Sequence, residues 1–173
     1  MWYKPIVSIL SIVLLAALQI TLNQGFNLFL SGFNLVLILI VVLINLTSPK
    51  NVILSALLGG FILDVYSSLP FGIFMFSLLG AAFLVEILFM NFLTNRSFYA
   101  LIIMGLLAVV IYNLFFIGLN SFFYFLGWSN SFVSLSFIKN FIWQLVDMAL
   151  VLSLSFSLIN YLSKKFKPVF LQP

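Results

Sequence analysis

Three acidic residues are the only side chains of this chain that could supply a carboxylate for acid-base or metal chemistry: Asp64, Glu86 and Asp147. Cysteine and histidine are absent, which excludes thiol nucleophiles, disulfides, His-dependent triads and nearly all zinc, haem and iron-sulfur ligation. Each acidic residue lies in an apolar run, where an ionisable group is expensive. At about 1.5 Å per helical residue the three fall at different depths, so we expect no paired-carboxylate site. The sequence predicts no catalytic, cofactor or metal site.

The composition places these residues in a bilayer. Hydrophobic residues make up 65% of the chain and charged residues 6%, and the mean hydropathy is +1.32, which leaves too little polar surface for a water-soluble globule. A net charge of +4, carried by scattered basic residues, favours contact with a membrane surface over nucleic acid. At roughly 20 residues per apolar helix, the 173 residues allow about six spans. We expect an all-α polytopic membrane protein: one domain, 1–173, with a bundle of about six transmembrane helices and short loops.

The expected spans are 6–22, 33–47, 49–68, 71–92, 98–125 and 137–162. The first apolar run is long and lacks a clean Ala-x-Ala step, which favours a retained span over a cleaved signal peptide. Ser48 as N-cap and Pro49 as the first helical residue predict the start of the third helix. Six spans with a cytoplasmic N-terminus put six basic residues inside and leave only Lys139 outside; the six are Lys4, Lys50, Arg96, Lys164, Lys165 and Lys167. Both termini are therefore predicted to be cytoplasmic.

Small and polar residues form one face of the third expected helix. Ala56, Gly60, Asp64 and Ser67 follow one another at steps of four, four and three, and Gly72 follows in a tight reversal into the next helix. Small residues allow close approach of helix backbones, which drives association in lipid. Two interpretations stay open: Asp64 serves a function, or the face is only a tight helix contact with a hydrogen-bonded carboxylate.

A second polar group is expected in the outer half of the bundle. Asn140, Gln144 and Asp147 share one face of the sixth span, and Asn113 and Asn120 share one face of the fifth. These side chains could line a water-accessible ligand pocket. They could instead form interhelical hydrogen bonds of about 1 kcal/mol each, the interpretation that we favour.

The remaining charges give two hypotheses. Lys139 lies at a depth from which it could act as counter-ion to Asp64 or Asp147. Glu86, surrounded in sequence by Phe and Leu, could face a partner's helix, or could be protonated or extended toward the surface.

The stretch Gly60-x3-Asp64-x7-Gly72, preceded by the turn with Pro49 and followed by a span with Gly80, resembles the bacterial rod shape-determining protein MreD family. The resemblance extends to the chain length, the six-span layout and the Asn34-Leu35-Val36-Leu37 entry to the second span.

This resemblance implies a non-catalytic component of the bacterial inner membrane, within the machinery that elongates the lateral peptidoglycan wall. The implied partners, besides membrane lipids, are the bitopic protein MreC, the MreB filament, and RodA with its cognate transpeptidase. Gly60, Asp64, Gly72 and Gly80 would be the interaction or structural motif.

Two other classes of protein are alternatives. The leading alternative is the substrate-binding S component of an energy-coupling factor vitamin transporter, which is also a small six-helix protein and would use the polar outer face. Its Ala-x3-Ala docking pattern is missing, since Ala16 and Ala17 are adjacent. A metal-dependent membrane enzyme built on Asp64 and Asp147 is disfavoured by their different depths and by the lack of a basic cluster to hold a phosphate.

Overall fold

The computed structural model describes residues 3–25, 34–92, 98–128 and 135–165, and the side chains of 10–22, 34–45, 47–91, 101–128 and 140–155. Six helices occupy these ranges, with no strand among the described residues. They are α1 (Tyr3–Gly25), α2 (Leu35–Leu46), α3 (Pro49–Val65), α4 (Ile73–Phe92), α5 (Phe98–Phe125) and α6 (Leu135–Lys165). The all-α prediction is confirmed for this part of the chain.

The first and sixth helices extend beyond the expected spans by two or three residues at each end, whereas the second and third helices are shorter than expected. α2 has 12 residues, about 18 Å, and begins after Asn34. α3 ends at Val65 rather than near position 68, and Ser67 lies in the turn, where its N–H donates to the Asp64 carbonyl over 3.2 Å. Ser67 is therefore not on the helical face predicted for it. Ser48 does precede Pro49 as N-cap residue, but its side chain makes no capping hydrogen bond.

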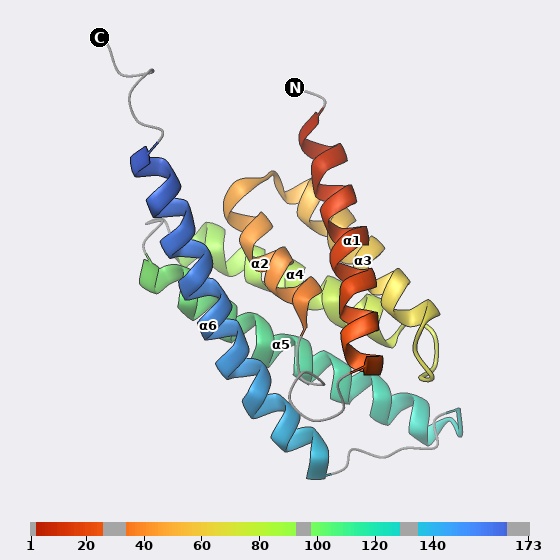
Figure 1. The fold of residues 1–173 in the computed structure, drawn as a ribbon. Helices are drawn as coiled ribbons and strands as arrows, with labels where there is room; N and C mark the ends of the chain where they lie inside the picture. The colour runs from red at the N-terminus through yellow and green to blue at the C-terminus, as the bar shows by residue number, and fades with distance from the viewer. Residues whose placement is uncertain (1–2, 26–33, 93–97, 129–134, 166–173) are drawn as a thin grey trace.

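α2 is the central helix. It contacts each of the other five helices, and Figure 1 shows it enclosed between α1 and α6. Its sequence is apolar on all sides, and most of its side chains are buried, among them Val36, Leu37, Ile40 and Val41. A helix that is hydrophobic all round is suited to such a position. The remaining helices pack in sequence around it, α3 against α4, α4 against α5 and α5 against α6, while α1 lies against α3.

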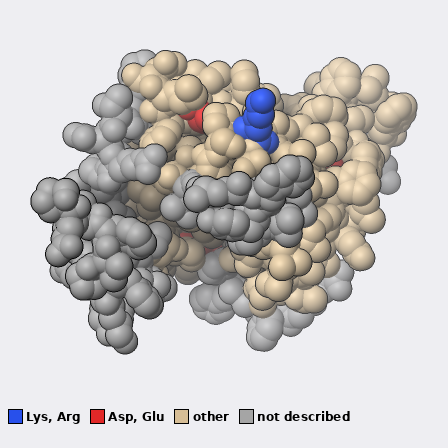
Figure 2. Space-filling view, turned by 90° about the horizontal axis from the view of Figure 1, so that it is seen from above, with Lys and Arg blue, Asp and Glu red and all other residues tan. Residues whose placement is uncertain are grey.

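Two helices are long and apolar enough to cross a membrane, by length and composition, within the described residues: Ile73–Asn91 of α4 and Leu101–Phe125 of α5. The start of α1 and the end of α6 lie at the same end of the bundle (Figure 1). Seen from that end, the described surface is mostly uncharged, with basic and acidic atoms visible only in small areas (Figure 2).

Candidate functional site

Among the polar groups predicted from the sequence, Asp64 has hydrogen bonds to both of its carboxylate oxygens. It belongs to what we call the α3–α4 junction: Gly60, Asp64 and Gly72 with the first turn of α4. Asp64 stands in the last turn of α3 and is only 3% exposed. Its Oδ1 accepts a hydrogen bond from the N–H of Phe74 over 2.9 Å, and its Oδ2 accepts one from the N–H of Met75, also over 2.9 Å. Both carboxylate oxygens are therefore bound to backbone groups that a helix start leaves without partners.

Gly72 explains why the side chain that caps α4 comes from another helix. Gly72 immediately precedes α4, and its carbonyl accepts the first helical bond, from the N–H of Phe76, over 2.9 Å. A residue in this position normally caps the helix with a side-chain oxygen, which glycine lacks. Its φ of +102° is one that other residues rarely adopt. The tight turn thus requires glycine, and Asp64 supplies the missing cap.

Gly60 brings the two backbones together. A Cβ atom at this position would lie 2.4 Å from the Cα of Met75, so any side chain would collide with the backbone of α4. Asp64 follows Gly60 by one helical turn in α3, and it accepts a hydrogen bond from the N–H of the same Met75. Glycine at 60 and aspartate at 64 therefore secure the same crossing point. Of the two interpretations left open by the sequence, the geometry agrees with the tight helix contact and its hydrogen-bonded carboxylate.

Chemically, the junction is a carboxyl group held at a helix start by two backbone donors. The helix dipole and the donated N–H groups favour a negative charge at such a position. With both oxygens engaged and almost no exposure, Asp64 is placed to hold α4 in position rather than to exchange protons or ligands.

A second capped helix start, the α2 cap, consists of Gln19, Asn34 and Tyr112. Asn34 Oδ1 accepts from the N–H of Leu37 over 3.1 Å, and Gln19 Oε1, from α1, accepts from the N–H of Val36 over 3.1 Å. Tyr112, from α5, is 4% exposed and interacts with the Asn34 side chain. The start of α2 therefore meets side chains from α1 and α5 as well as its own N-cap residue.

Sequence reasoning missed the roles of Gln19 and Tyr112. The only signal available was a polar residue within an apolar run, and Gln19 is indeed 4% exposed.

The predicted polar residues of α5 and α6 form what we call the α5–α6 seam: Asn113, Gln144 and Asp147. Asn113 Nδ2 donates to Gln144 Oε1 over 2.8 Å and to the Val109 carbonyl over 2.8 Å. Asp147 is 8% exposed, and its Oδ2 has no hydrogen-bond partner among the described residues. The favoured interpretation, interhelical hydrogen bonding, thus describes the Asn113–Gln144 pair.

The other predicted polar residues lie as follows. Asn120 is 6% exposed, whereas Asn140 is half-buried. Glu86 is 7% exposed, so it faces its own bundle, and the hypothesis that it faces a partner's helix is wrong. The side chain of Lys139 lies outside the described residues, so its proposed pairing stays a prediction. Among the described residues, no three acidic side chains gather as a metal would require.

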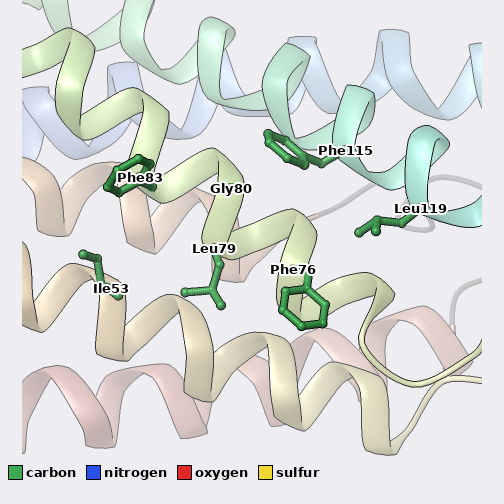
Figure 3. A pocket seen from close by; sticks show the side chains of 7 residues that line it. All are labelled: Ile53, Phe76, Leu79, Gly80, Phe83, Phe115 and Leu119. Atoms are coloured by element: carbon green, nitrogen blue, oxygen red, sulfur yellow. The ribbon is translucent and has the colours of Figure 1, made fainter.

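Gly80 stands where α4 meets α5. A Cβ atom there would lie 2.8 Å from the ring of Phe115, so glycine leaves space that this ring occupies. Beside it opens an apolar cavity of about 490 Å³ between α3, α4 and α5 (Figure 3). None of the predicted polar residues lines this cavity.

The chain matches no protein-family model, no curated protein and no solved structure.

Proposed function

We propose that this protein is a non-catalytic, six-span component of a bacterial inner membrane that acts through helix contacts with partner proteins, in the manner of MreD in cell elongation. Its partners would be MreC and, through it or directly, MreB, RodA and the cognate transpeptidase. Both termini would be cytoplasmic.

Membrane placement is supported by the outward-facing side chains of several helices. Large apolar residues are exposed along the helix surfaces, for example Leu14 (61%), Phe83 (54%), Leu114 (65%) and Leu150 (57%). Water-soluble monomers rarely expose contiguous apolar patches of this kind. In lipid the same surface costs nothing, and helical hydrogen bonds satisfy the backbone groups of the helix interiors.

An even number of spans is supported by the arrangement of the bundle. The start of α1 and the end of α6 lie at one end (Figure 1). α2 and α3, about 18 and 25 Å long, are short for a 30 Å hydrocarbon core. Because α2 is enclosed by other helices, its short length would be accommodated inside the protein rather than against lipid.

The observation that carries the proposal is the α3–α4 junction. The most distinctive motif of the sequence uses glycine for close backbone contact and aspartate for a helix cap. Such a motif gives a rigid two-helix unit, which suits a structural partner. The energy-coupling factor alternative gains less support, because Asn113 and Gln144 bind each other instead of lining the described cavity.

The test is affinity purification of the tagged protein from its native membrane in mild detergent, with co-purifying proteins identified by mass spectrometry. Recovery of MreC and the wall synthases is the expected result. A Gly60→Leu variant should lose these partners, whereas Gly118→Ala should keep them, since a Cβ at 118 would meet nothing within 4 Å.

Two outcomes would contradict the proposal. Recovery of transporter ATPases, together with a vitamin that raises the melting temperature, would establish the transporter alternative. Recovery of MreC at the same level with Gly60→Leu would separate the motif from partner binding.

A further inference from the structure

The apolar cavity beside Gly80 is an open groove on the outer surface of the bundle. Its wall residues come from three helices: Ile53 of α3; Phe76, Leu79, Gly80 and Phe83 of α4; and Phe115 and Leu119 of α5. Phe76 and Phe83 are each 54% exposed and stand at its two ends along α4 (Figure 3). The groove therefore opens toward the surroundings of the protein rather than into its core.

The dimensions of the groove fit part of a hydrocarbon chain. Phe76 and Phe83 are seven residues apart, so the groove runs for about 10 Å along α4. Its volume is about 490 Å³. A single hydrocarbon chain can lie along a groove of this length. Every lining side chain is apolar, as such a chain requires.

A positive charge stands near one end of the groove. Lys50 is exposed in the first turn of α3 and precedes Ile53 by three residues, so the two share a face about 5 to 6 Å apart at their Cβ atoms. Ile53 lies at the same end of the groove as Phe83 (Figure 3). In the proposed topology this end is cytoplasmic, and the inner leaflet carries anionic lipids that attract lysine.

We propose that the groove is a binding site for one acyl chain of an anionic phospholipid of the cytoplasmic leaflet, with the lipid phosphate near the Lys50 ammonium. Gly80 keeps the Phe115 ring against α4 and so shapes the wall between the helices. The inference rests on the membrane placement proposed above and not on the identity of the protein partners.

The experiment places the photoreactive residue p-benzoylphenylalanine at position 83, in the groove, and in a separate variant at position 114. Leu114 is an adequate control because it is 65% exposed, comparable to Phe83, and does not line the groove. Each protein is reconstituted into vesicles of the bacterial lipids phosphatidylglycerol and phosphatidylethanolamine and irradiated. The masses of the adducts are then determined by intact-protein mass spectrometry.

The expected result is an adduct of one phosphatidylglycerol at position 83, several-fold in excess over its share of the vesicle, with no such excess at 114. Lys50→Gln, at an exposed position that leaves the fold intact, should reduce the excess about fivefold, the factor that corresponds to one lysine near an anionic surface. Lipid adducts at 83 that mirror the vesicle composition, or that ignore Lys50→Gln, would overturn the proposal. A protein-sized adduct at 83 in native membranes, from a partner or a second copy, would also overturn it.

Discussion

Two buried carboxylates of this chain differ in what surrounds them. At the α3–α4 junction both oxygens of Asp64 accept backbone hydrogen bonds, from Phe74 and Met75. In the α5–α6 seam, Asp147 is nearly as buried, yet its Oδ2 has no partner among the described residues. Burial alone therefore does not say what an acidic residue does in an apolar bundle; the donors within reach of its oxygens decide.

The physical difference lies in the position along the helices. The junction places Asp64 at the start of α4, where free N–H groups and the helix dipole favour an anion. Asp147 stands in the interior of α6, where every neighbouring N–H is already committed to the helix. The same residue type is thus expected to stabilise the protein at one place and to cost stability at the other.

The largest effect is expected from breaking the junction at Gly60. Gly60→Ala places a Cβ 2.4 Å from the Met75 backbone, which cannot move without displacing α4, and should cost about 3 kcal/mol. Thermal unfolding in detergent measures the loss. Gly118→Ala is the matched control and should leave the melting temperature unchanged or raised; equal losses in both variants would refute the close crossing at Met75.

A smaller loss is expected from Asp64→Asn. The amide would present an N–H to one of the two backbone donors and would remove the charge at the helix start, at a cost of about 2 kcal/mol. The same unfolding measurement applies, with hydrogen exchange at Phe74 and Met75 as a local readout. Unchanged exchange at these two amides would mean that Asp64 does not cap α4.

Substitution of Asp147 is expected not to lower the free energy of unfolding, in contrast to substitution of Asp64. Asp147→Asn should have little effect on stability, because it replaces the carboxylate by an uncharged amide. Asp147→Leu should raise stability by about 1 kcal/mol, because it removes a buried oxygen that has no partner among the described residues. Measured beside Asp64→Asn, these variants test the comparison directly. A loss at Asp147 similar to that at Asp64 would show that Asp147 has a partner outside the described residues. If an Asp147 variant is as stable as the unchanged protein but does not support growth of cells that depend on it, Asp147 has a functional role.

The smallest effect is expected within the α5–α6 seam. A double-mutant cycle of Asn113→Ala and Gln144→Ala should give a coupling energy of about 0.6 kcal/mol, the usual size for a hydrogen bond between helices in lipid. A coupling energy near zero would mean that the two amides do not bind each other.

Much of the fold could be predicted from the sequence, because apolar runs and turn residues mark helices locally. The fifth helix, 98–125, has the predicted bounds, and Pro49 begins the third as expected. The position of Gly60, Asp64 and Gly72 around a close helix contact was also foreseen. The hydrogen-bond donors of Asp64 could not be predicted, since they lie 10 and 11 residues away in sequence and become neighbours only when the turn is formed.

The rest depends on contacts between distant segments. Gln19 caps a helix that begins 16 residues later, and Tyr112 reaches Asn34 from another helix. A single sequence contains no periodicity that links such pairs. The two interpretations of Glu86 could not be separated for a similar reason. Its apolar sequence neighbours resemble lipid-facing residues, while its helix face is buried by other helices, which excludes the interpretation that it faces a partner's helix.

The central position of α2 constrains how the chain can be assembled during synthesis. α2 leaves the ribosome before α3, α4, α5 and α6, which later cover it, and its start needs Gln19 from α1 and then Tyr112 from α5. In the proposed membrane placement, a helix of about 18 Å is too short to span a hydrocarbon core of about 30 Å on its own. With that placement we expect the insertion machinery to retain α1 and α2 together, and their final packing to await the synthesis of the C-terminal helices.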